Sequence, residues 1–313
     1  MISWGFSLII VYPDYYPSFY CIADKCRNSC CIGWEIDIDP RSLRRFLSLS
    51  GELGDCLRKN IMADDDGAHF ILAEGERCPF LEQNGLCRLI REKGEAFLCR
   101  ICSDHPRYYH FRSDGIEKGL GLCCEAACDL ILNQREPVRF VIRDDGRRKT
   151  PPRKWEQQYV VLLNELVMIA QDRTKQIQDR LKCILSMVGM EHADLTPSHW
   201  LEEFKNLEHM DMEWEYLLDS AAFEDNPLAF PPVMVEQLIV YFMYRHLFAG
   251  CQSRLAPYYI GFAVLSVRMI LAIAGNRQEM LCDIARRYSA EIEYSDVNIQ
   301  QIISCLQKEV ICK

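Results

Sequence analysis

The sequence predicts a mainly α protein with a few short strands, in which an N-terminal cysteine-cluster domain is followed by a C-terminal helical domain. Two observations support this prediction. Twelve of the 17 cysteines lie before residue 129, among short apolar runs and turn residues. From Trp155 onward, apolar residues recur at helical spacing almost throughout. We therefore predict a cysteine-rich metal-binding domain over residues 1–135, a linker over 136–154 and a helical domain over 155–313.

The cysteine-rich part contains short elements. Asp39 and Pro40 are typical cap and first residues of a helix, here over residues 41–49. Asn84 and Gly85 predict a tight hairpin turn that brings Cys78 and Cys87 to one end of the same hairpin. Further helices are predicted over residues 89–98 and from 124 through 132, and strands or extended segments over 1–20, 35–38 and 69–72.

The second half predicts five long helices, at about 155–188, 198–221, 231–249, 256–274 and 277–312. The apolar stretch from residue 258 to 274 contains Arg268 and is short for a membrane span, so a buried helix is the better interpretation. Residues 1–12 are apolar but lack the basic start of a signal peptide. We therefore expect a cytoplasmic protein that does not insert into a membrane.

Charge and cysteine usage restrict the function. A net charge of -9 argues against sequence-independent binding to nucleic acid, which needs a basic surface. In the reducing cytoplasm, cysteines at short, unequal spacings are better explained by metal ligation than by disulfides. A zinc ribbon would need two Cys-x-x-Cys pairs, and only Cys99 and Cys102 have that spacing. The three-cysteine motif typical of radical enzymes that cleave S-adenosylmethionine also fails, because Gly33 stands at its third thiol.

Four motifs carry a resemblance to a known family. They are Cys-x4-Cys-x3-Cys-Cys-x-Gly-Trp from Cys21 to Trp34, Cys-Pro-Phe-Leu…Leu-Cys-Arg from Cys78 to Arg88, Cys-Ser-x-x-Pro-Arg from Cys102 to Arg107, and Leu-Cys-Cys-Glu-Ala-Ala around Cys124. Together they resemble the flagellin lysine-N-methylase family, whose members are described as zinc- or iron-chelating and as methyltransferases. The resemblance implies methylation of protein lysines, with flagellin as substrate and S-adenosylmethionine as methyl donor.

The resemblance also implies a metal centre. An iron–sulfur cluster, of the 4Fe-4S type, is the leading expectation and zinc is the alternative. The ligand candidates carried over from the motifs are Cys21, Cys26, Cys30, Cys31, Cys78, Cys87, Cys102 and Cys124. The fourth motif departs from the family's usual Cys-Pro-Glu, so that Cys123 could take the place of Cys124. Cys99 and Cys128 lie beside the motifs as spare thiols or alternate ligands.

Methyl transfer to lysine requires a neutral amine, since the ammonium has no lone pair, so the site must desolvate the amine or supply a base. Asp104, His105 and Tyr108, beside Cys102, are the candidate catalytic residues, although a turn with exposed polar groups explains them equally well. Two other functions remain open. One is a non-catalytic, metal-stapled module that binds protein, and the other is an iron–sulfur protein for redox sensing or electron transfer.

Overall fold

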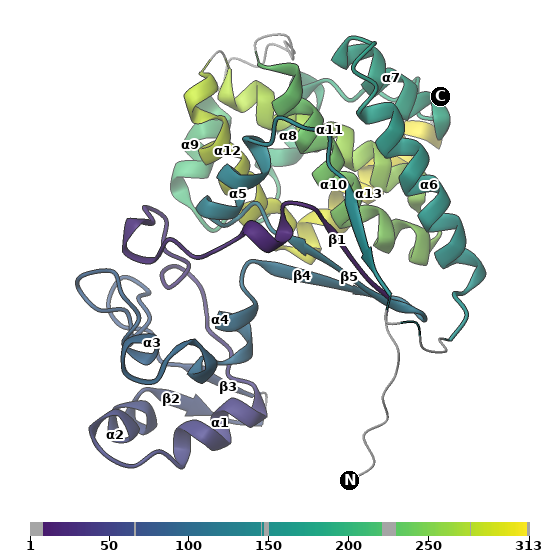
Figure 1. The fold of residues 1–313 in the computed structure, drawn as a ribbon. Coiled ribbons are helices and arrows are strands. Elements are labelled where there is room, and N and C mark those ends of the chain that lie inside the picture. Colours follow the sequence, from purple (N-terminus) through teal and green to yellow (C-terminus); the bar gives the residue numbers. More distant parts are fainter. Residues whose placement is uncertain are drawn as a thin grey trace. The chain divides into compact units, whose positions relative to one another are not determined.

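The computed structural model describes residues 9–65, 67–144, 146, 150–220, 230–275 and 277–311. Their contacts divide the chain into two compact units (Figure 1). Unit 2 consists of Tyr20–Tyr108 and Cys124–Ala126, and unit 1 contains the described residues before and after these segments, including Tyr109–Cys123. The chain is mainly helical with a few short strands, as predicted. The predicted domain boundaries are not confirmed, because residues from both sides of them group in unit 1.

Unit 2 is built from short elements around a small core. The elements are α1 (Pro40–Leu47), α2 (Glu52–Lys59), β2 (Ile61–Ala63), β3 (Ala68–Phe70), α3 (Arg88–Lys93) and α4 (Arg100–Asp104), with 3-10 turns at Ala23–Lys25 and Glu95–Phe97. Phe46, Leu57, Phe70 and Phe80 are almost completely buried, and thiols pack among and against them.

The local predictions for unit 2 are partly confirmed. Asp39 caps α1, since its Oδ1 atom accepts hydrogen bonds from the backbone N–H groups of Arg41 and Ser42 at 3.1 and 3.0 Å. The helix predicted over 89–98 is too long: α3 ends at Lys93 because Gly94 takes a φ of +81°, which a helix cannot continue through. The extended segment predicted over 35–38 is partly confirmed: Asp37 forms an isolated bridge to His69, and the backbone of Ile36 and Ile38 hydrogen-bonds to that of Phe70 and Ala68.

A four-stranded sheet of order β4–β5–β1–β6 was not predicted as such. Its strands are β1 (Ile9–Pro13), β4 (Arg107–Phe111), β5 (Gly115–Leu120) and β6 (Phe140–Arg143), and β1 pairs parallel with β5 and antiparallel with β6. Figure 1 shows β1, β4 and β5 running alongside one another. A side chain at Gly115 would meet the carbonyl oxygen of Ile9 at 2.1 Å, so the approach of β1 requires glycine. β6 falls within residues 136–154, which we had predicted to be a linker.

The helices of the second half are shorter and more numerous than predicted. They are α5 (Glu125–Leu132), α6 (Lys154–Ala170), α7 (Ile177–Met187), α8 (Pro197–Lys205), α9 (Met212–Ser220), α10 (Pro232–Ser253), α11 (Ala256–Ala274), α12 (Leu281–Tyr288) and α13 (Asp296–Ile311), with 3-10 turns at Tyr16–Ser18 and Gln278–Met280 and a π-helical turn at Ser289–Glu293. The helices predicted over 256–274 and near 231–249 are confirmed as α11 and α10.

Three predicted helices are each interrupted by a polar side chain that bonds the backbone. Asp172 accepts from the backbone N–H of Thr174 at 3.2 Å and separates α6 from α7. Asp211 accepts from the N–H of Glu213 at 2.9 Å at the start of α9, and Ser295 accepts from the N–H of Asn298 at 3.2 Å at the start of α13. Such bonds compete with the helical ladder, and apolar spacing alone does not reveal them.

The core of unit 1 is formed largely by α10 and α11, which are buried along most of their length. In the described residues, α11 is the one helix long and apolar enough to cross a membrane, and 78% of its apolar window is buried inside the protein. That burial is typical of the central helix of a folded core, as predicted.

Candidate metal centre

The first cysteine motif is held in shape by its own glycine and tryptophan. Gly33 has a φ of +89°, a region that favours glycine, and its N–H donates to the carbonyl oxygen of Glu76 at 3.1 Å. The indole N–H of Trp34 donates to the carbonyl oxygen of Cys30. The Trp34 ring meets the His105 ring edge-on, with centroids 5.5 Å apart. The first and third motifs, about 70 residues apart in sequence, therefore meet at their aromatic residues.

Five thiols form what we call the inner thiol group: Cys31, Cys78, Cys87, Cys99 and Cys102. The N–H of Cys78 donates to the carbonyl oxygen of Cys31 at 2.8 Å, and Cys87 bridges back to Leu81 across the Asn84-Gly85 turn. The Sγ atoms of Cys99 and Cys102 are 3.5 Å apart. Cys78 and Cys99 are buried in the core of unit 2, and the other three pack against it. The hairpin that the sequence predicted is therefore confirmed.

The thiols of the inner group perturb one another electrostatically. Burial raises the pKa of Cys78 to about 12, and the charges of Cys31, Cys87 and Cys99 add to the effect. The pKa of Cys102 is raised first by its hydrogen bond with Cys99, then by burial and by the charges of Cys99, Cys31 and Cys78. Without a cation Cys78 and Cys102 hold their protons at neutral pH. A bound metal ion would replace the protons and stabilise the thiolates.

Four more thiols form an outer thiol group: Cys21, Cys26, Cys30 and Cys124. Cys21 and Cys30 are exposed, and the other two are half-buried. The pKa of Cys30 is raised first by its hydrogen bond with Cys31, then by burial and by the charges of Cys31, Cys21 and Cys124. The same hydrogen bond with Cys30 lowers the pKa of Cys31 to about 7. Cys30 and Cys31 therefore connect the outer group to the inner one.

All eight predicted ligands fall in these two groups. Sequence reasoning left Cys99 outside the ligand set, although it belongs to the inner group and is fully buried. Its Cys-x-x-Cys spacing to Cys102 was the signal that could have included it. Cys124 belongs to the outer group. Cys123 instead lies near Tyr294: burial is the main cause that raises the pKa of Tyr294, and the charge of Cys123 raises it further. Cys128 instead donates to the carbonyl oxygen of Cys282 at 3.3 Å.

Thiolates are the donors that both an iron–sulfur cluster and a zinc ion take. In the described part of the chain, no three Cys, His, Asp or Glu side chains stand close enough together to hold one metal ion. A tetrahedral zinc site requires sulfurs about 3.8 Å apart. An iron–sulfur cluster takes each thiolate on a different iron atom, so its ligands stand farther apart. The Sγ atoms of Cys99 and Cys102, 3.5 Å apart, are close to the zinc spacing, so the thiol spacing does not favour a cluster over zinc.

The three candidate catalytic residues lie between α4 and β4. Asp104, the last residue of α4, approaches Nε of Arg100 at 3.4 Å. The Nε2 atom of His105 is buried without a hydrogen-bond partner, and burial, together with the charge of Arg107, lowers the pKa of His105 to about 4. Tyr108 is half-buried in β4. His105 is therefore neutral at pH 7 and a weak base.

Unit 1 contains several buried carboxylates that the sequence did not single out, among them Glu117 and Glu293. Glu293, on the π-helical turn, accepts hydrogen bonds from Tyr241 at 2.9 Å and pairs with His246 at 2.6 Å. Glu117, on β5, accepts from Tyr159 at 2.5 Å and pairs with Arg112. Each has other charged residues close by in the sequence, so no local pattern marks it. Such fully paired carboxylates hold an interior together and do not by themselves define an active site.

Comparison with known proteins places the chain in a family. The sequence model for the FliB lysine N-methylase C-terminal domain matches residues 153–312, about half of the chain. Lysine-N-methylases of Salmonella typhimurium and Salmonella choleraesuis are each 28% identical to the chain over 145 residues, which are 42% of this chain and 34% of each relative. Flagellar biosynthetic protein FliU of Salmonella muenchen is 24% identical over 156 residues, 48% of this chain and 92% of that protein.

No solved structure matches the chain significantly. The chain belongs to the FliB lysine-N-methylase family, as the four cysteine motifs predicted. The match covers about a third of the length of the two lysine-N-methylases.

Proposed function

We propose that the protein is a protein-lysine N-methyltransferase that uses S-adenosylmethionine and acts on flagellin. The observation that carries this proposal is the family match over residues 153–312. The names of the relatives support it, since two are lysine-N-methylases and one is a flagellar biosynthetic protein. The net charge of -9 suits a partner surface that presents lysines.

The proposed reaction is a direct displacement. The lone pair of the lysine ε-nitrogen forms a bond to the methyl carbon, the carbon–sulfur bond of the sulfonium breaks, and S-adenosylhomocysteine leaves with the electron pair. The nitrogen loses one proton to water or to a base. Since His105 has a pKa of about 4, it is a poor partner for a lysine ammonium, and desolvation of the amine is the better way to neutralise it.

We further propose that the inner thiol group holds a 4Fe-4S cluster, with zinc as the alternative metal. When bound, the metal centre would tie together chain segments that are remote in sequence and would add directly to folding free energy. Cys78, Cys87, Cys99 and Cys102 would supply four thiolates, and Cys31 a fifth donor beside them. Free thiols in such number call for a reducing compartment, so we propose a cytoplasmic location.

The experiment is to purify the full chain without oxygen, measure iron, zinc and acid-labile sulfide, and incubate it with S-adenosylmethionine and flagellin. Mass spectrometry should then find methyl-lysine on flagellin. Cys78→Ala should lose metal and methylation together, whereas the control Cys183→Ala, on an exposed thiol of α7, should lose neither. If intact, metal-loaded protein binds no S-adenosylmethionine and methylates no protein, the methyltransferase proposal is wrong and the protein-binding module replaces it. A reversible reduction without methyl transfer would favour the redox protein.

A further inference from the structure

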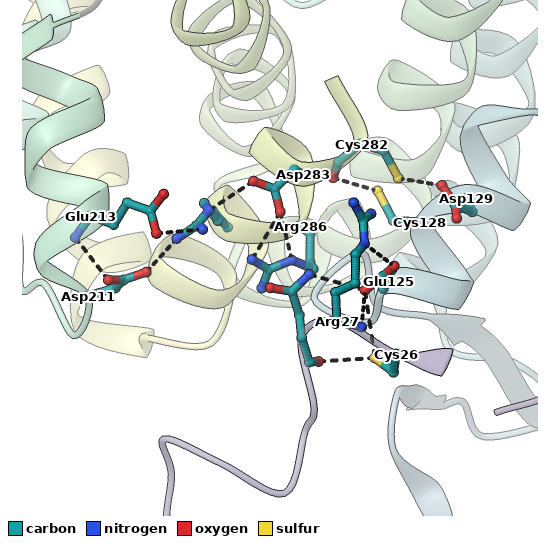
Figure 2. Close-up of polar contacts among 12 residues, drawn as sticks. Cys26, Arg27, Glu125, Cys128, Asp129, Asp211, Glu213, Cys282, Asp283 and Arg286 are labelled. Carbon is teal, nitrogen blue, oxygen red and sulfur yellow. Dashed lines mark hydrogen bonds and ion pairs between the residues drawn. The ribbon is translucent and has the colours of Figure 1, made fainter. Parts of the chain in front are cut away.

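The carboxylate of Glu125 makes four polar contacts with the loop that carries Cys26 of the outer thiol group. Its Oε2 atom accepts hydrogen bonds from the backbone N–H of Arg27 at 3.0 Å and from Nδ2 of Asn28 at 3.1 Å. Its Oε1 atom accepts from Nε of Arg27 at 2.9 Å. The thiol of Cys26 also points at Oε2, at 3.8 Å. Figure 2 shows Cys26 and Arg27 converging on this one carboxylate. One side chain therefore binds three consecutive residues of the first cysteine motif.

These contacts explain an unusual feature of the chain. The three residues Cys124–Ala126 group with Tyr20–Tyr108 in unit 2, although Cys123 before them and Ala127 after them group with unit 1. Through this placement Cys124 comes near enough to Cys30 for their charges to interact. Among the described contacts, Glu125 supplies the polar bonds that join this short segment to the loop of Cys26.

We propose that Glu125 is a positioning residue that holds Cys124 against the loop of Cys26 and Cys30, and so assembles the outer thiol group before any metal binds. The contacts of Glu125 are present without a metal. The inference rests on the proposed metal centre only for the purpose of these contacts, which is to prepare thiols for metal binding. The candidate ligands are all thiols. Glu125 is not a ligand but a residue that positions two of them.

The chemistry favours a carboxylate at this position. All three nitrogen groups that face Glu125 are donors, and an ionised carboxylate is acceptor-only. Glutamine has the same shape but turns an NH2 group toward one donor, so it can satisfy only part of the set. The side chain of Glu125 is 9% exposed, whereas that of Arg27 is 78% exposed. The bonds to the backbone N–H and to Asn28 should therefore contribute more than the ion pair, which water screens.

A simpler role has to be separated from this one. Glu125 is the first residue of α5, where a negative charge also stabilises the helix N-terminus. A helix-stabilising residue alone would change the melting temperature without exposing Cys26 or Cys124. The reactivity of these two thiols is therefore the readout that distinguishes positioning from capping.

The experiment uses the full, metal-free chain under reducing conditions. Iodoacetamide labelling followed by peptide mass spectrometry gives the alkylation rate of each cysteine, and the variants are Glu125→Ala, Glu125→Gln and Asn28→Ala. Because Glu125→Ala removes several charge-assisted hydrogen bonds at once, Cys26 and Cys124 should be alkylated about tenfold faster or more in this variant, and less so in Glu125→Gln. The matched control is Asp55→Asn, which breaks an exposed pair with Arg58 in α2 and should leave both rates unchanged.

Metal reconstitution gives a second, independent readout. Because Cys30 and Cys31 connect the outer group to the proposed inner metal site, Glu125→Ala should bind less iron than the unmodified protein, and Glu125→Gln should recover part of it. Unchanged alkylation of Cys26 and Cys124 in Glu125→Ala would overturn the positioning role. If Glu125→Ala fails to fold, Asn28→Ala removes one of the donors that bind Glu125. Unchanged alkylation rates of Cys26 and Cys124 in Asn28→Ala would then overturn the positioning role as well. If the unmodified chain binds no metal but the alkylation rates change, the metal proposal fails while the positioning role stands.

Discussion

Glu293 offers the sharpest test of how the interior of unit 1 is held together. Its carboxylate is fully buried on the π-helical turn, where it faces Nε of Arg245 at 3.0 Å, His246 at 2.6 Å and the hydroxyl of Tyr241 at 2.9 Å. Tyr241 in turn accepts a hydrogen bond from the backbone N–H of Leu122 at 3.1 Å. The carboxylate therefore links α10 to the π-helical turn, and Tyr241 extends the link to the end of β5.

Glu293→Gln keeps the volume of the side chain but removes its charge. Arg245 is 10% exposed, so the substitution removes a charged partner from a buried guanidinium, and breaking such a pair costs about 3–5 kcal/mol. That loss is a large part of the usual stability of a folded domain, about 5–15 kcal/mol. The double variant Arg245→Met with Glu293→Gln should recover part of the loss, because no lone charge remains buried.

Urea unfolding followed by circular dichroism at the helix band measures the change in the free energy of unfolding, since most helical residues lie in unit 1. The control is Asp219→Asn, which breaks the exposed pair with Lys205 and should cost under about 1 kcal/mol. A Glu293→Gln protein as stable as this control would refute the reasoning. A double variant less stable than Glu293→Gln would also refute it, because the penalty would then not come from breaking the pair between Arg245 and Glu293.

Three further predictions concern thiols, a helix cap and pH. Single alanine substitutions at Cys30 and Cys87 should each lower the metal content of anaerobically purified protein, while Cys305→Ala leaves it unchanged; equal losses at all three would show that the thiol groups are not the metal centre. Asp39→Ala should lower the thermal stability of the chain by about 1 kcal/mol through loss of the α1 cap, and Asp39→Asn by less, as calorimetry would measure. Burial lowers the pKa of His246 despite its pairing with Glu293, so the unfolded chain takes up a proton at a pH where the folded chain does not. Stability should therefore fall as the pH drops below about 6.5, and His246→Gln should flatten this slope; an unchanged slope would contradict the prediction.

Local features of the fold could be read from the sequence wherever they depend on neighbouring residues. Asp39 and Pro40 fix the start of α1, and Asn84 with Gly85 fixes the turn between Cys78 and Cys87, because caps and tight turns are decided within a few residues. The apolar run that became α11 was equally readable, since its whole circumference is buried. The sheet was missed, because β4, β5 and β6 are short and become strands only by pairing with remote strands, β5 and β6 with β1 and β4 with β5.

The sequence by itself determined the family and the set of thiols available for a metal centre, because both depend on residue types and spacings along the chain. Only the tertiary structure divided those thiols into an inner and an outer group, added Cys99 to the inner one and separated Cys124 from Cys123. It also gave Glu125 its contacts with Arg27 and Asn28, across almost 100 residues. The physical reason is that thiol and carboxylate contacts of this kind form between segments remote in sequence, and the spacing of residues along the chain carries no information about which remote segments meet.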